Sequence, residues 1–194
     1  MWNERFSEPG YAYGKDPNRF LESVAHEIPA GRVLSLAEGE GRNAVYLAGL
    51  GYQVTAVDAS TVGLTKAESL AEERGVEIET VHADLADYEI GSGEWQGIIS
   101  IFCHLPPLVR AALHEQVLRG LAPGGVLILE GFTPRQLEYG TGGPKSRELL
   151  MELEVIRQEL PGLRFEIARE VEREITAGKY HGGVGSVLQI LAVK

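Results

Sequence analysis

The 194-residue sequence has almost no cysteine, few histidines and no long hydrophobic run. Its only cysteine, Cys103, excludes an internal disulfide. The five histidines have no partner at metal-binding spacing, so we expect no built-in metal site. No apolar stretch approaches the roughly 20 residues that cross a bilayer, and the first ten residues lack the apolar core of a secretory signal. These absences predict a cytoplasmic protein with no membrane segment.

Positive charge is also scarce, because 18 Lys and Arg face 28 Asp and Glu, which gives a net charge of −10. Nucleic-acid phosphates are repelled by such a surface unless its basic residues cluster, and the sequence contains no basic run. We therefore expect no nucleic-acid partner. The length and the 44% of apolar residues fit one domain with a substantial core, residues 1–194.

Five apolar segments rich in Val, Ile and Leu alternate with amphipathic helical patterns. Such segments are typical of strands buried on both faces, and their alternation with helices predicts a doubly wound parallel α/β sheet. The expected strands are residues 33–37, 53–58, 77–84, 97–103 and 124–132, and the expected helices are residues 18–27, 43–50, 61–74, 106–121 and 146–160.

The last part of the sequence breaks this alternation. Residues 163–175 and 184–194 each have the pattern of a strand, and only residues 176–183 separate them. Parallel neighbours need a crossover of a dozen or more residues, so these two strands must be antiparallel. The sequence therefore predicts a mostly parallel sheet that closes with an antiparallel hairpin.

Two irregular stretches fall outside these elements. Residues 1–17 contain four of the 14 aromatic residues, too many for a solvated tail. Residues 133–145 form a Gly- and Pro-rich loop that leaves the fifth strand at its carboxyl end, where ligands bind in open α/β sheets. We interpret residues 1–17 as a lid over that edge and residues 18–194 as the core.

The densest chemical signal is SLAEGEGRNA, residues 35–44, between the first strand and the first helix. Gly39, Gly41 and Ala44 fit the pattern G-x-G-x-x-A, in which glycines let the backbone approach a nucleotide. Asp58, 19 residues after Gly39, ends the second strand and can hold ribose hydroxyls. In the alternative interpretation, the glycines form a tight turn and Asp58 caps a helix.

A second aspartate ends the third strand. Asp84 can bind the adenine amino group there, with the backbone of Leu85 near the ring. The loops after three strands would then meet a nucleoside at one edge of the sheet.

Two cofactor classes can use this frame, the nicotinamide dinucleotides and S-adenosylmethionine. Glu38 and Glu40 in the glycine loop would repel a pyrophosphate by roughly 1 kcal/mol per close pair. S-adenosylmethionine instead carries a sulfonium and an ammonium cation, which carboxylates attract. The loop therefore favours S-adenosylmethionine.

The motifs VLSLAEGEGRN, VTAVDAS, HADLADY, GIISIFCHLPP and LAPGGVLILEGF resemble those of class I S-adenosylmethionine-dependent methyltransferases. The opening WNERF…YAYG…PNRFL resembles the branch with tellurite-resistance and thiopurine-type methyltransferases. The resemblance implies a Rossmann-like seven-stranded sheet of order 3-2-1-4-5-7-6 with an antiparallel last strand. It also implies S-adenosylmethionine as cofactor and a small-molecule acceptor, for which the branch favours a thiol or a chalcogen oxyanion.

One motif departs from the family pattern. Ser35 stands where the family usually has Asp or Glu, and Ala37 follows two residues later. We interpret Glu38 as the replacement that contacts the methionine ammonium. With the residues above, the resemblance assigns these further residues to the cofactor: Ala37, Asn43, Ala59, Ile101, Arg5 and Tyr13.

His104 follows the fourth strand, where such enzymes present residues to the acceptor, and it is our candidate catalytic base. Its alternative role is to cap the helix that Pro106 starts. Two other functions stay open, an NAD(P)-dependent oxidoreductase and a non-catalytic S-adenosylmethionine-binding protein. The sequence leaves the acceptor and the oligomeric state undefined.

Overall fold

The computed structural model describes residues 2–194, with the side chain of His181 left out. The helices are α1 (Trp2–Phe6), α2 (Arg19–Val24), α3 (Arg42–Gly49), α4 (Thr61–Arg74), α5 (Pro107–Gly120) and α6 (Leu153–Glu159), with the 3-10 helices η1 (Ala25–Glu27), η2 (Pro134–Glu138) and η3 (Arg147–Leu149). The strands are β1 (Arg32–Leu36), β2 (Gln53–Asp58), β3 (Glu79–His82), β4 (Trp95–Ile101), β5 (Leu121–Phe132), β6 (Arg164–Ala177) and β7 (His181–Val193).

The seven strands form one sheet in the order β3-β2-β1-β4-β5-β7-β6. Strands β3, β2, β1, β4 and β5 pair in parallel, and β7 runs antiparallel to both β5 and β6. This arrangement confirms the expected sheet order and its antiparallel closing strand.

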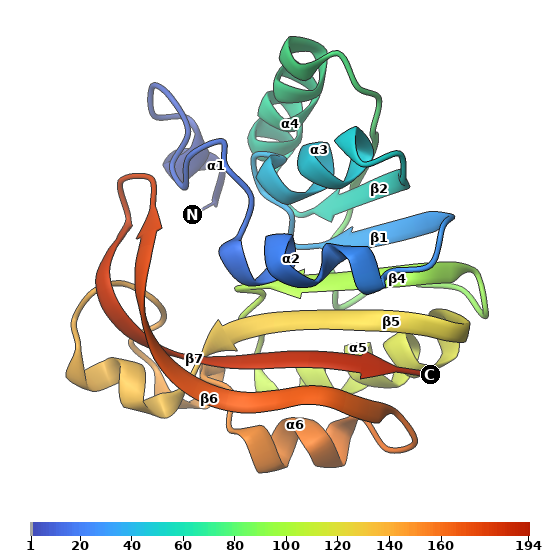
Figure 1. The fold of residues 1–194 in the computed structure, drawn as a ribbon. Helices are drawn as coiled ribbons and strands as arrows, with labels where there is room; N and C mark the ends of the chain where they lie inside the picture. The colour runs from blue at the N-terminus through green and yellow to red at the C-terminus, as the bar shows by residue number, and fades with distance from the viewer. Residues whose placement is uncertain (1) are drawn as a thin grey trace.

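Helices cover both faces of the sheet. In Figure 1, α2 and α3 lie in front of the strands, and α5 and α6 lie behind them. Successive residues of β5 pack against the helices on opposite faces of the sheet, because side chains alternate along a strand. Ile128 packs in one core cluster with Leu47 of α3, and Leu129 packs in the other with Leu113 of α5.

The carboxyl ends of the parallel strands point to the side of the molecule where the N-terminal segment lies (Figure 1). The long β6–β7 hairpin bends beyond the sheet toward α1 on this side. The backbone N–H of Lys179, at the hairpin tip, donates to the carbonyl of Ala12 over 2.8 Å. The aromatic N-terminal segment therefore packs at the carboxyl edge of the sheet, and its role as a lid stays a prediction.

The expectation of one helix over residues 146–160 is wrong. The chain forms η3 and α6 with an extended stretch between them, in which the N–H of Met151 donates to the carbonyl of Phe132 over 2.9 Å. This bond to the end of β5 replaces the helical bond that Met151 would otherwise make.

The hairpin and the loop after β5 are also more regular than expected. The strands continue to Ala177 and from His181, so residues 178–180 make the turn. Residues 134–138 of the loop form η2, and the amide of Gln136 donates to Thr141 and to the carbonyl of Gly142. No helix of residues 2–194 is long and apolar enough to span a bilayer.

Candidate functional site

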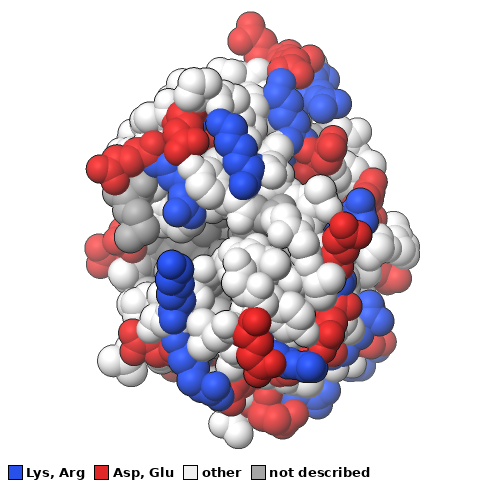
Figure 2. Space-filling model, turned by 90° about the vertical axis from the view of Figure 1, so that its left-hand side faces the viewer, with Lys and Arg blue, Asp and Glu red and all other residues white. Residues whose placement is uncertain are grey.

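A cavity of about 560 Å³ lies at the carboxyl edge of the sheet. It is bounded by the loops after β1, β2, β3 and β4, by the N-terminal segment, by residues 142–144 and by Tyr180 of the hairpin turn. Figure 2 views the molecule from this side and shows the hollow near the middle of the face. The volume falls within the range of about 300–1,000 Å³ that is usual for small-molecule sites.

The structure brings nearly all of the predicted site residues to this cavity. The lining includes Arg5, Tyr13, Ala37, Glu38, Gly39, Asn43, Asp58, Ala59, Asp84, Leu85, Ile101 and His104.

Gly41 is the exception, because it does not line the cavity. It caps α3 with φ +90°, and a Cβ at this position would lie 2.6 Å from the Cα of Ala67 in α4. Gly41 is therefore needed for the close packing of α3 on α4, and its assignment to the cofactor stays a prediction.

The glycine loop is built around a buried carboxylate. Glu38 Oε1 accepts hydrogen bonds from the backbone N–H groups of Asn43 (2.9 Å) and Ala44 (3.0 Å), and the Ser35 hydroxyl donates to Oε2. Burial raises the pKa of Glu38, and these three donors oppose that rise. The carboxylate thus caps the N-terminus of α3, where negative charge is stabilised. Its contact with a methionine ammonium stays a prediction.

Two residues with side chains adopt left-handed backbone at the cavity wall. Ala37 after β1 has φ +50°, and Phe102 after β4 has φ +54°. Such backbone is rare outside glycine and is often found at functional sites. Sequence patterns mark neither residue as strained, because neither is glycine.

Asp58 joins the loops after β1 and β2. Its Oδ2 accepts from the N–H of Gly39 over 2.8 Å, and its Oδ1 accepts from the N–H of Ser60 over 2.7 Å. The side chain is 7% exposed, and burial raises its pKa. A carboxylate has about four acceptor positions, so two remain for ligand hydroxyls. Asp84 is exposed at the rim, where its Oδ1 accepts from the N–H of Ala86 over 2.9 Å.

Charged residues fix the N-terminal segment to the core through contacts that the sequence pattern does not predict. Glu40 Oε2 accepts from the N–H of Ala12 over 2.6 Å, and Glu40 Oε1 pairs with Lys66 over 2.8 Å. The Lys66 ammonium also donates to the carbonyls of Glu8 and Gly10. Phe6 packs directly over the loop, because a Cβ on Gly39 would lie 3.1 Å from its ring.

The same segment meets the hairpin through Arg5 and Tyr180. The Arg5 guanidinium lies 4.7 Å from the Tyr180 ring centroid and donates to the Tyr13 hydroxyl over 2.9 Å. The Tyr180 hydroxyl donates to Glu8. The cavity is thus covered by two segments at opposite ends of the chain.

Comparison with known proteins agrees with this geometry. Residues 33–125, just under half of the chain, match the family described as methyltransferase domain. A search of curated protein sequences finds no match.

Solved structures with the same fold include the enzyme studied for conversion of a disulfide bond into a thioacetal group in echinomycin biosynthesis (20% identity, TM-score 0.77, 98% of this chain and 86% of that chain). A SAM-dependent methyltransferase from Methanosarcina mazei is similar over 92% and 98% (18% identity, TM-score 0.72). TehB from Haemophilus influenzae is similar over 90% of this chain and 61% of its own (18% identity, TM-score 0.73). The family match to residues 33–125 and the shared Rossmann-like fold support a methyltransferase that uses S-adenosylmethionine.

The cavity residues of the methyltransferase fit this cofactor. Asp58 has acceptor positions for ribose hydroxyls, and the carboxylates of Glu38 and Asp84 also face the cavity and suit a ligand that carries cationic groups. Backbone near Gly39 can approach a ligand closely. No group of three or more metal-ligating side chains occurs among the described residues.

His104 lines the same cavity, with both ring nitrogens engaged. Its Nδ1 bonds to the carbonyl of Leu149 over 2.9 Å, and its Nε2 accepts from the N–H of Phe132 over 3.2 Å. Burial lowers the pKa of His104 to about 4. In this arrangement neither nitrogen is free to take a proton, so its role as a base stays a prediction without geometric support.

The neighbouring Cys103 is buried, as expected. Burial raises the pKa of its thiol to about 12, so it is protonated at neutral pH. It is therefore a core residue rather than a nucleophile.

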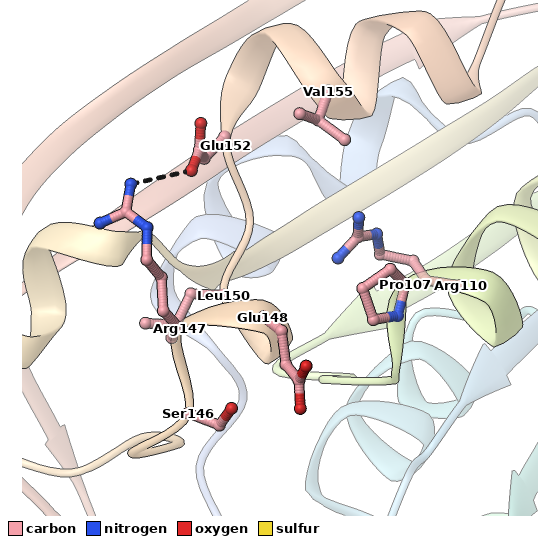
Figure 3. A pocket seen from close by; sticks show the side chains of 8 residues that line it. All are labelled: Pro107, Arg110, Ser146, Arg147, Glu148, Leu150, Glu152 and Val155. Carbon is pink, nitrogen blue, oxygen red and sulfur yellow. Dashed lines mark hydrogen bonds and ion pairs between the residues drawn. The ribbon is translucent and has the colours of Figure 1, made fainter.

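A second cavity, of about 590 Å³, lies between α5, η3 and α6 (Figure 3). Arg147 pairs with Glu152 there over 3.0 Å, and Arg110 is bonded to Glu159. It has no glycine loop and no strand-end aspartate among its lining residues. We therefore expect the cofactor in the first cavity.

Proposed function

We propose that this methyltransferase transfers the methyl group to a small molecule with a soft nucleophile, a thiol or a reduced chalcogen oxyanion. One observation carries the proposal. The described part of the cavity offers no side chain poised to remove a proton from an acceptor.

Four titratable groups near the strand ends already have another task, and Asp84 lies exposed at the rim, where we assign it to the adenine. Glu38 and Asp58 accept backbone N–H groups, and Glu40 pairs with Lys66. His104 is bonded at both nitrogens. Hydroxyl and amine acceptors need a general base, whereas a thiolate or a reduced chalcogen oxyanion reacts without one.

The chain's contribution is then alignment and exclusion of water. When bound, S-adenosylmethionine supplies a methyl group activated by its sulfonium. Well-oriented reactants gain roughly 10⁵ M or more in effective concentration. We assign the ribose to Asp58, the adenine amino group to Asp84 and the methionine carboxylate to Arg5 or Tyr13, with residues 1–17 as the lid.

Two similarities support a sulfur or chalcogen acceptor. The opening motif resembles the tellurite-resistance and thiopurine-type branch, and the TehB structure shares the fold. The enzyme named for thioacetal formation also shares it.

An acceptor screen tests the proposal. The protein is incubated with S-adenosylmethionine carrying a labelled methyl group and with thiols, selenite, tellurite, phenols or primary amines. We expect label in the thiol or chalcogen products. Transfer only to phenols or amines would show that a base is used and would overturn the acceptor class.

A further inference from the structure

A fully buried carboxylate, Glu130 of β5, lies outside the cavity lining and is 0% exposed. Removing a carboxylate from water costs several kcal/mol unless partners replace its hydration. Its Oε1 accepts from Arg173 and from Asn18 Nδ2 (2.8 Å), and its Oε2 accepts from Arg173 Nε (3.2 Å) and Gln189 Nε2 (2.7 Å). These four donors use all of its acceptor positions, so Glu130 has none left for a ligand.

The partners of Glu130 connect two distant parts of the molecule. Arg173 belongs to the hairpin strand β6, and Asn18 caps α2 by accepting from the N–H of Leu21. The backbone N–H of Asn18 donates to Asn43 Oδ1 over 2.9 Å. The N–H of Asn43 in turn donates to Glu38 Oε1 over 2.9 Å.

A continuous chain of hydrogen bonds therefore runs from the hairpin to the glycine loop. Its interior members are all nearly inaccessible to solvent, with Asn18 3%, Asn43 5% and Glu38 8% exposed. Hydrogen bonds in such surroundings are strong, and breaking one leaves a buried group unsatisfied. Each hydrogen bond of this series is therefore costly to break.

A second connection runs beside the first. Arg42 interacts electrostatically with the carboxylates of both Glu130 and Glu38. Arg42 also lines the cavity. In addition, the carbonyl of Glu130 accepts from the N–H of Phe102, the left-handed residue at the cavity wall, over 2.6 Å.

We propose that Glu130, held by Arg173, is a positioning residue that fixes Asn43 and the glycine loop for cofactor binding through Asn18. This inference rests on the proposed function of the site. It connects strand β6 to the cofactor site, although β6 contributes no residue to the cavity lining.

The first test is calorimetric titration of S-adenosylhomocysteine into the full-length Glu130→Gln variant. The substitution removes the charge that pairs with Arg173 and replaces one of the two acceptor oxygens by an NH2 donor, and we expect the dissociation constant to rise between about 2-fold and 30-fold. The KM for S-adenosylmethionine should rise with it, while kcat changes little, because the residue acts on cofactor positioning.

Glu159→Gln is the matched control. Glu159 of α6 is a largely buried carboxylate bonded to Arg110 and His114, and none of these three lines the cofactor cavity. The control should lower the melting temperature but leave the dissociation constant unchanged.

Arg173→Gln provides a second variant if Glu130→Gln does not fold, because the Arg173 side chain is 19% exposed. Its effect on binding should be non-additive with that of Asn43→Ala in a double-mutant cycle. Wild-type affinity in folded Arg173→Gln protein, or full additivity in the cycle, would overturn the positioning role alone. Failure of the wild-type protein to bind the ligand would instead overturn the proposed function.

Discussion

The Ser35 hydroxyl donates a hydrogen bond to the carboxylate of Glu38, three residues further along the chain. Position 35 is where the resemblance to class I methyltransferases implies an acidic residue. The backbone at Ala37 turns back with φ +50°, which brings the Glu38 side chain to the end of β1. The negative charge thus comes from position 38 instead of position 35, but the carboxylate still lies beside the end of β1.

This relationship predicts an order of effects for two variants. Glu38→Gln should weaken S-adenosylmethionine binding by about 1.5–3 kcal/mol, because it removes a charged acceptor. Ser35→Ala should weaken binding by only about 0.5–1.5 kcal/mol, because it removes one neutral donor. Calorimetry on both variants measures the order, and the reverse order would mean that Glu38 only caps α3.

Asp58→Ala should cost about 1.5–3 kcal/mol in cofactor binding, because it removes charge-assisted bonds to the ribose. Asp87→Ala is the control, since Asp87 is an exposed aspartate that follows β3 and does not line the cavity. The measurement is the dissociation constant of S-adenosylhomocysteine for both variants. An unchanged value in Asp58→Ala would show that Asp58 only ties Gly39 to Ser60.

The buried His104 should make stability depend on pH. Its pKa is about 4 in the folded protein, below its ordinary value of 6.5, so the unfolded chain binds the proton more readily. The contribution of His104 to the free energy of unfolding is therefore fully present above pH 6.5 and is lost as pH falls toward 4. Between pH 6.5 and 5 the loss is at most about 2 kcal/mol.

Urea unfolding at these two pH values checks this dependence. His104→Asn should lose less stability on acidification than the wild type, whereas His26→Asn, on the exposed surface, should behave as the wild type. Equal losses in His104→Asn and the wild type would show that His104 is not held neutral.

The N-terminal lid makes a prediction about hydrogen exchange. Residues 1–17 should exchange readily in the free protein and become protected with S-adenosylhomocysteine. Deleting them should abolish methyl transfer but keep the fold, because the described part of this segment, residues 2–17, contains no strand. Equal protection with and without ligand, or full activity after deletion, would make the segment ordinary packing.

Much of the fold follows from local patterns in the sequence. Strand β2 and helix α4 occur where the apolar patterns place them, and Asp58 lies at the end of its strand, as the motif implies. These features depend on residues close together in the sequence, so a single sequence is enough to predict them.

The features that sequence analysis missed depend on contacts between distant residues. The pairing of Glu40 with Lys66 and the partners of Glu130 span many positions, and no periodicity encodes them. The break between η3 and α6 also depends on a contact between distant residues, because the N–H of Met151 donates to the carbonyl of Phe132. Gly41 fitted a cofactor motif, yet its conformation serves the contact with Ala67.

The central claim is that the acidic glycine loop binds S-adenosylmethionine. Calorimetric titration of the wild-type protein with S-adenosylmethionine, S-adenosylhomocysteine, NAD and NADP tests it most directly. We predict saturable binding of the first two ligands at one site per chain and no binding of the dinucleotides, because the carboxylate of Glu38 repels a pyrophosphate while the charge of Glu40 is compensated by Lys66. Tight binding of NAD or NADP, without binding of S-adenosylhomocysteine, would contradict the account.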